Sequence, residues 1–189
     1  MVQKPPKKVP VAGDISHNHG FLLAMGGLLV NWANAESIFM AMLQAALGVD
    51  KFTAAIVWHS FRGNTKARLD LTLRLCRERT NDTDLIEAIE GACSQFIGFS
   101  KVRNFFCHAS YSYDAEGKLD FANGAELTHE SDPIRFVMKP MDRATANEII
   151  DAATKLAPFS EHCWDLAERI AARIGGPPVE RPQHPLRKC

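Results

Sequence analysis

Residues 96–113, FIGFSKVRNFFCHASYSY, decide how the rest of the chain is interpreted. Before and into this stretch the apolar residues recur at helical spacing, which predicts a long amphipathic helix with one buried stripe: Leu85, Ile89, Ala92, Phe96 and Phe99. The same phase continues to Arg103 and Cys107. The helix is therefore expected to end in a polar cluster, Arg103, Asn104 and His108, that turns back toward the other helices rather than out into water.

The spacing within this cluster limits which side chains can meet. Arg103 and His108 are five residues apart, so on a helix they differ by about 140° in direction and about 7.5 Å in height. Asn104 lies one turn below His108 and is expected to hydrogen-bond to the imidazole or to orient it. After His108 the apolar period changes to two, which predicts that the helix ends there.

Helical periodicity also covers the chain well before the cluster. Residues 21–47 form one predicted helix, with Gly48 just past its end. Asp50 is expected to cap a second helix within residues 50–79, which is either kinked or split at residues 63–64. The sequence thus predicts two or three helical segments ahead of the long one.

Turn signals mark the segments on both sides of the long helix. Residues 81–84, NDTD, predict a turn and cap, because Asp84 is followed three residues later by Glu87 in the manner of a capping box. After the cluster, residues 110–140 are expected to form a small β insert of two or three strands, with a turn at residues 114–117.

Helical spacing returns over residues 143–174, where Pro158 is expected either to kink the helix or to start a second one. The domain is expected to span residues 16–174. Residues 1–15 are rich in Pro and Lys and predict a disordered basic arm, and residues 175–189 predict a Pro-rich disordered tail. The fold class is therefore mainly α, with four to five helices and a small β-hairpin insert after the third helix.

The order Arg-Asn-x-x-x-His near the end of the third helix resembles the mark of the HEPN superfamily (higher eukaryotes and prokaryotes nucleotide-binding). In that family Arg is followed, after four to six residues, by His, and a polar residue often stands directly after Arg. Arg103, Asn104 and His108 fill these places. The long helix before them, and the Tyr-rich segment and hairpin after them, follow an order similar to one HEPN branch. The resemblance covers about residues 16–174 and implies a HEPN-like up-and-down helical bundle.

The resemblance implies a homodimer in which the two copies of the motif meet in one cleft and cleave RNA without a metal ion or other cofactor. His108 would take the proton from a ribose 2′-hydroxyl, because an imidazole can accept a proton near neutral pH. Arg103 would stabilise charge on the phosphorus with its paired donors. Asn104 would orient His108 or bind phosphate. The products would be a 2′,3′-cyclic phosphate and a 5′-hydroxyl.

Four further residues are candidates for contacts with the substrate. Tyr111 and Tyr113 follow the cluster directly and offer rings for base stacking. His59 and Arg62 lie in a Trp-flanked group on the second predicted helix and are candidates for the cleft wall. The expected substrate is single-stranded RNA, and the expected role is that of a toxin or of a stress or phage-defence effector with a possible cognate antitoxin.

Charge and cysteine usage restrict the class of protein. Lys and Arg together number 22 and Asp and Glu also number 22, so a strongly basic nucleic-acid binder is excluded and any polyanion site must be local. Residues 50–79 are locally basic, whereas residues 111–132 carry six acids and one lysine. The five cysteines are odd in number and lack CxxC spacing, which favours reduced thiols and a cytoplasmic protein. The longest apolar run is too short for a membrane span.

Other interpretations of the same residues stay open. Arg103 can simply pair with an acid, and His108 can stabilise the helix C-terminus. A second functional hypothesis is a non-catalytic HEPN-like dimer that binds a protein or a nucleotide through the same cleft. A zinc site at Cys107 and His108, together with His162 and Cys163, is disfavoured because adjacent residues on a helix point about 100° apart. The sequence has no Gly-rich phosphate loop, GxSxG or HExxH motif.

Overall fold

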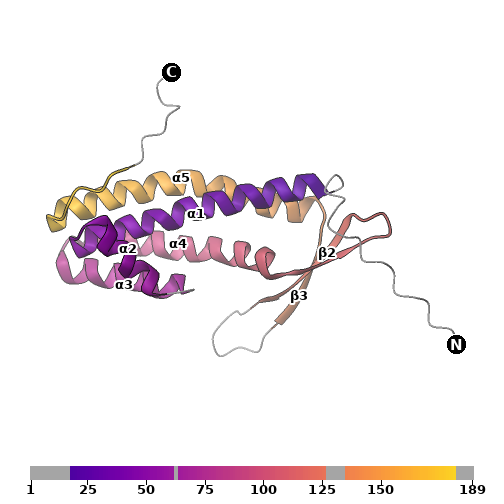
Figure 1. Ribbon diagram of the computed structural model, residues 1–189, viewed down its shortest axis with the longest axis horizontal. Coiled ribbons are helices and arrows are strands. Elements are labelled where there is room, and N and C mark those ends of the chain that lie inside the picture. Colours follow the sequence, from indigo (N-terminus) through magenta and orange to yellow (C-terminus); the bar gives the residue numbers. More distant parts are fainter. Residues whose placement is uncertain (1–17, 62–63, 127–134, 182–189) are drawn as a thin grey trace, which may run out of the picture. The chain divides into compact units, whose positions relative to one another are not determined.

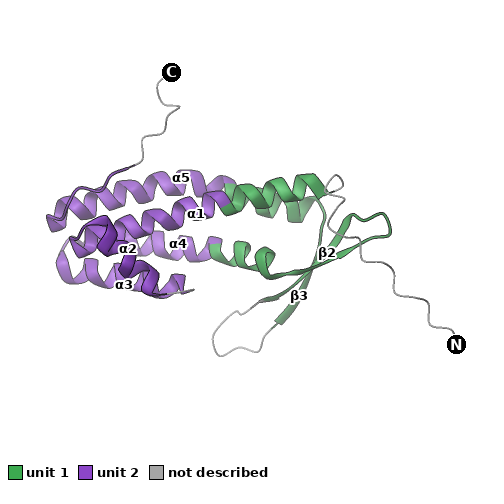
Figure 2. Ribbon diagram, in the orientation of Figure 1, with its two compact units in different colours: residues 1–29, 100–153 green, residues 30–99, 154–189 purple. Residues whose placement is uncertain are grey.

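The computed structural model describes residues 18–61, 64–126 and 135–181 (Figure 1). This part of the chain is mainly helical, as predicted, and its elements follow one another as α1 (His19–Leu47), α2 (Lys51–Ser60), α3 (Thr65–Arg79), α4 (Thr83–His108), β1 (Ser110–Tyr113), β2 (Leu119–Glu126), β3 (Arg135–Pro140) and α5 (Arg143–Ile174). The predicted basic arm, the residues after 181 and Arg62 lie outside the described residues. Figure 2 shows the two compact units into which the chain divides.

The second of these units comprises residues 30–99 and 154–189, and its core is aromatic. The ring of Phe96 stacks on that of Trp32 at a centroid distance of 4.0 Å and also packs near Phe39 and Phe159, at 4.8 and 6.0 Å. All four side chains are buried. The apolar stripe that predicted the long helix therefore supplies the centre of this core.

Local capping signals set the helix ends in the second unit. Gly48 has a φ of 70°, which ends α1, and the carboxylate of Asp50 accepts hydrogen bonds from the backbone N–H groups of Phe52 and Thr53 at the start of α2. The segment that was predicted to be kinked or split is split. Asn64 begins α3 by accepting a hydrogen bond from the backbone N–H of Ala67 at 2.9 Å.

Two predictions about helix boundaries are changed by the structure. The cap of α4 is Asp82, whose Oδ1 accepts from the backbone N–H of Leu85 at 3.0 Å, and the predicted capping box at Asp84 falls inside the first turn instead. The segment predicted as the second helix forms two helices, α2 and α3, so the β insert follows the fourth helix and not the third. At Pro158, by contrast, α5 continues as one helix. In the predicted tail, Arg181 forms ion pairs with Glu161 and Asp165 on α5.

The first unit comprises residues 1–29 and 100–153 and contains an antiparallel sheet in the order β1-β2-β3. The turn between β1 and β2 is the predicted one: Gly117 has a φ of 83°, and Oδ1 of Asp114 accepts from the backbone N–H of Glu116 and of Lys118. Asn18 ties this turn to the start of α1, since its Oδ1 accepts from the backbone N–H of Leu119 at 2.9 Å.

One face of the sheet packs on helices within the first unit. Tyr111, Ala122 and Lys139 are paired across the three strands and share this face. The ammonium of Lys139 lies 4.6 Å from the ring centroid of Phe105 on α4 and 2.8 Å from a carboxylate oxygen of Glu148 on α5. We call this the covered face, because it holds the sheet against the helices.

Gly124 lies on the covered face at a close approach between β2 and α4. A Cβ at this position would lie 2.6 Å from Cε2 of Phe105, which is closer than side-chain carbons pack. We expect Gly124→Ala to lower the free energy of unfolding by about 1–3 kcal/mol, because the buried Phe105 ring must shift. Chemical denaturation followed by circular dichroism measures this change.

The matched control for Gly124→Ala is Gly98→Ala on α4, where a Cβ would meet nothing within 4 Å. Alanine is the better helix former, so this variant is expected to be about 0.5–1 kcal/mol more stable than the natural protein. If Gly124→Ala and Gly98→Ala have the same free energy of unfolding, the close approach between Gly124 and Phe105 is contradicted.

No single helix in residues 18–61, 64–126 and 135–181 is long and apolar enough to cross a membrane. Helices α1 and α2 meet that requirement only as a pair, and the pair is bent by 114° at its break.

Candidate functional site

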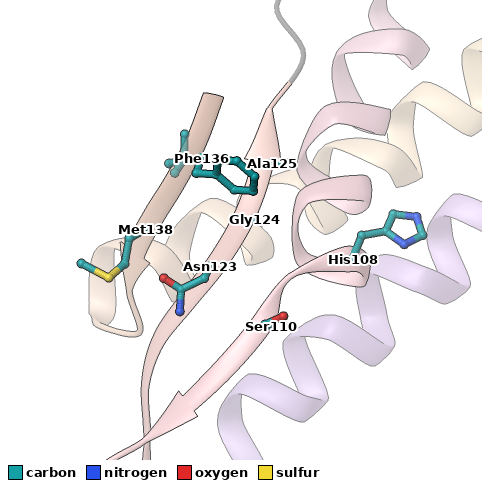
Figure 3. Close-up of a pocket in the computed structure, with 8 residues that line it drawn as sticks. His108, Ser110, Asn123, Gly124, Ala125, Phe136 and Met138 are labelled. Atoms are coloured by element: carbon teal, nitrogen blue, oxygen red, sulfur yellow. The ribbon is translucent and has the colours of Figure 1, made fainter. Parts of the chain in front are cut away.

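His108 is the last residue of α4, and its side chain is exposed. It lines a shallow groove of about 370 Å³ in the first unit, together with residues from all three strands: Ser110, Asn123, Gly124, Ala125, Phe136, Val137 and Met138 (Figure 3). Strand register explains the meeting, because Ser110 pairs with Asn123 and Asn123 pairs with Met138. The groove therefore joins the end of α4 to one row of side chains across the sheet.

The side chains around this groove differ in direction. In Figure 3 the imidazole of His108 points away from β3, so the ring stands at the rim of the groove rather than inside it. Asn123 presents an amide and Ser110 a hydroxyl, which together supply donors and acceptors. Phe136 and Met138 supply apolar surface on β3. The groove is thus mixed in character, with a titratable ring at one side.

Arg103 and Asn104 form a pair of their own on the last turns of α4. Nη1 of Arg103 donates a hydrogen bond to Oδ1 of Asn104 at 2.7 Å. This contact uses one lone pair of the amide oxygen and neither of its N–H donors, so the role of Asn104 in orienting His108 or binding phosphate stays a prediction. Neither residue of the pair lines the groove. A single chain therefore places His108, but not Arg103, beside the groove.

The two tyrosines lie in different surroundings. Tyr111 is half-buried on the covered face, with its ring centroid 5.5 Å from that of Phe21 and its hydroxyl donating to the backbone oxygen of Phe106. Burial raises the pKa of Tyr111 to about 12. Its ring is therefore occupied by packing inside the protein. Tyr113, at the end of β1, is 38% exposed and keeps a free ring surface.

The remaining predicted residues belong to the second unit. His59 lies on α2 with an exposed side chain, next to the buried Trp58. Arg68 of α3 covers the Trp58 ring at 5.0 Å and forms an ion pair with Glu36 at 3.1 Å. His59 therefore stands on the outer side of a helix whose inner side is fixed by packing.

Sequence reasoning missed the groove residues Ser110, Asn123, Phe136 and Met138. A signal for two of them exists, since the alternation in residues 135–139, RFVMK, places Phe136 and Met138 on one face of a strand. The sequence does not say which face is covered, however. That depends on register with a strand more than ten residues away.

The cysteines differ in exposure. Cys76, Cys93 and Cys163 are buried in the second unit, and burial raises their pKa values to about 11, 12 and 12. Cys107, beside His108, is exposed. Within the described ranges, no three His, Cys, Asp or Glu side chains gather closely enough to hold a metal ion.

The candidate site is therefore an exposed imidazole at the rim of a mixed polar and apolar groove, with a hydrogen-bonded arginine and asparagine on the same helix end. These are the three residues on which the resemblance to the HEPN superfamily is based. Comparison of the chain with models of known protein families, with curated proteins and with solved structures finds no match.

Proposed function

We propose that the protein is a HEPN-type, metal-independent endoribonuclease that cleaves single-stranded RNA. The observation that carries the proposal is the position of His108, an exposed imidazole at the end of α4 and at the rim of a groove with hydrogen-bonding groups. An imidazole in such a place is accessible to a ribose, and histidine is the side chain that most often acts as a general base. The mainly helical fold and the Arg103–Asn104 pair are compatible with this role.

In the proposed reaction, His108 takes the proton from a ribose 2′-hydroxyl while the 2′-oxygen forms a bond to the adjacent phosphorus. The bond from phosphorus to the 5′-oxygen breaks, and that oxygen receives a proton as it leaves. The products are a 2′,3′-cyclic phosphate and a 5′-hydroxyl. A guanidinium stabilises the negative charge that gathers on the phosphoryl oxygens.

The reaction needs an acid as well as a base, and it needs a cation near the phosphate. Among the described residues of one chain, His108 is the one imidazole that lines the groove, and Arg103 does not line it. A two-fold dimer places copies of one surface opposite each other, so His108 of the partner subunit supplies the second proton-transfer group. The proposed enzyme is therefore a homodimer, with a cognate antitoxin as its expected regulator if it acts as a toxin.

The proposal is tested by incubating the purified full chain with a mixed-sequence, fluorescently labelled single-stranded RNA in excess EDTA. We expect fragments that end in a 2′,3′-cyclic phosphate and begin with a 5′-hydroxyl, identified by mass spectrometry. An otherwise identical strand with 2′-deoxyribose throughout is the control and is expected to stay intact, because it lacks the nucleophile. Cleavage of the deoxy strand, products with 5′-phosphates, or no cleavage of RNA would contradict the proposed chemistry.

A non-catalytic binding module is the second candidate, and a separate surface favours it. Phe52 and Ile56 lie four residues apart on α2 and are 82% and 70% exposed. Side chains at this spacing share one side of a helix, so they form a continuous apolar strip of the kind that protein partners cover. If the RNA stays intact in the cleavage assay, binding of a partner protein is the function that the structure then favours.

A further inference from the structure

The sheet of the first unit has a second face, and no helix in the described part of that unit covers it. Phe136 is 88% exposed and Met138 is 62% exposed, although both stand in the middle of β3. Asn123 and Ala125 of β2 pair with these two residues and are also exposed. By contrast, Ala122 and Gly124, which alternate with them, are buried. We call the side with Asn123, Ala125, Phe136 and Met138 the open face.

We propose that the open face binds an unpaired RNA base, with the ring of Phe136 stacking on it and the amide of Asn123 hydrogen-bonding to its edge, an inference that rests on the proposed endoribonuclease function. The base would lie in the groove, and its ribose and phosphate would stand at the rim beside His108. The open face would thus hold the substrate beside His108, and rotation of the His108 side chain, which points away from β3 in Figure 3, would bring the imidazole to the ribose.

The chemistry of the groove fits a base better than a purely apolar ligand. An exposed aromatic ring on a sheet gives a stacking surface that accepts any base. The Asn123 side chain has both donors and an acceptor, which match the mixed edge of a base. Ser110, on the neighbouring strand and paired with Asn123, adds a hydroxyl on the same side. The groove volume of about 370 Å³ is large enough for one base and part of its sugar.

Two acids of the turn between β1 and β2 lie at the far end of β1 from the groove, and Glu126, which follows the lining residue Ala125, is paired with Arg135 on β3. Asp114 and Glu116 lie in the turn beyond Tyr113, whereas the groove lies at the other end of β1, at Ser110. Three residues of strand separate the two positions, a distance of about 10 Å. None of the eight described residues that line the groove is acidic. A phosphate at the rim is therefore kept away from the acids of the turn.

A single strand is the form of RNA that this face can bind. Bases within a duplex are stacked and paired, so their faces and edges are not free to meet Phe136 and Asn123. A protein strand is the alternative occupant, but strand addition uses backbone groups at a sheet edge rather than side chains on its face. The side chains present, an exposed ring beside an amide and a hydroxyl, favour a base.

The test measures binding of 5′-fluorescein-labelled 12-mers by anisotropy, using RNA with 2′-fluoro substitution so that no cleavage occurs. Phe136→Ala is expected to weaken binding about tenfold or more, as loss of a stacked base does. Phe136→Trp is expected to bind RNA about as tightly as the natural protein, because tryptophan also stacks on a base. Phe136→Leu is expected to bind as weakly as Phe136→Ala, because leucine keeps the apolar surface but has no ring. Leu23→Ala, which shortens another highly exposed apolar side chain of the first unit, is the matched control and is expected to bind like the natural protein.

Base selection and oligomeric state complete the test. Asn123→Ala is expected to reduce the differences in affinity among oligo-A, oligo-C, oligo-G and oligo-U, and a blunt duplex is expected to bind more weakly than any single strand. Unchanged affinity in Phe136→Ala, equal rescue by leucine and tryptophan, or no binding by the natural protein would overturn the proposal. So would conversion of a dimer to a monomer by Phe136→Ala in size-exclusion chromatography, because the open face would then be a protein interface.

The two proposals fail in different ways. Phe136-dependent binding without any cleavage of natural RNA leaves the base site in place and removes the nuclease. His108-dependent cleavage with an unchanged KM in Phe136→Ala leaves the nuclease in place and removes the base site.

Discussion

Replacement of His108 by alanine is expected to reduce the rate of RNA cleavage by about 10²–10⁴-fold, the contribution that a general acid or base typically makes. In the proposed dimer both proton-transfer groups are copies of this residue, so one substitution removes the base and the acid together. Single-turnover cleavage of labelled RNA, with the protein in excess over RNA, measures the chemical step without product release. His108→Ala is expected to keep the melting temperature of the natural protein within a few degrees, because the side chain is exposed.

The control for this variant is His162→Ala, which removes another exposed imidazole, from α5 in the second unit. It is expected to cleave RNA at the natural rate. A His108→Ala protein that retains full cleavage would show that the imidazole is not the base. A His108→Ala protein that unfolds many degrees earlier would instead assign His108 a structural role, such as stabilising the C-terminal end of α4.

The helices were predictable because their boundaries depend on residues a few positions apart. Gly48 ends α1, Asp50 begins α2 and Asn64 begins α3 through contacts within three residues of the cap. The cap of α4 was predicted at Asp84 and lies at Asp82, because two carboxylates compete for the same few N–H groups. Asp82 and Asp84 both stand near its start, and only the three-dimensional path of the turn decides which carboxylate reaches a free N–H group.

Only the part of the candidate site that lies on one helix, α4, was predictable from the sequence. The sequence places Arg103, Asn104 and His108 at the end of α4, and the structure does the same. The partner of Asn104 was not predictable, because several side chains on adjacent turns are within its reach. The groove was not predictable either, since it needs the register of β1 with β2 and of β2 with β3. A shift of one residue would exchange the open and covered faces.

Substitution of Phe96 by alanine is expected to have the largest effect on stability among single changes in the second unit. Its ring is fully buried and contacts three other aromatic rings, those of Trp32, Phe39 and Phe159. Truncation of a buried phenylalanine to alanine costs about 3–5 kcal/mol, because apolar contacts are lost and a cavity is left. For a chain of this length the melting temperature is expected to fall by roughly 6–20 °C.

The matched control is Phe52→Ala, which removes the same atoms from the surface of the same unit. It is expected to change the free energy of unfolding by no more than about 0.5 kcal/mol. Urea denaturation of both variants is followed by tryptophan fluorescence, to which Trp32 contributes together with the two other tryptophans of the chain. If the two variants unfold at the same urea concentration, Phe96 is not at the centre of the core. A much lower free energy of unfolding for Phe96→Ala than for Phe52→Ala would show that packing of the stacked rings stabilises this unit, because both substitutions remove the same atoms and Phe96 alone is buried.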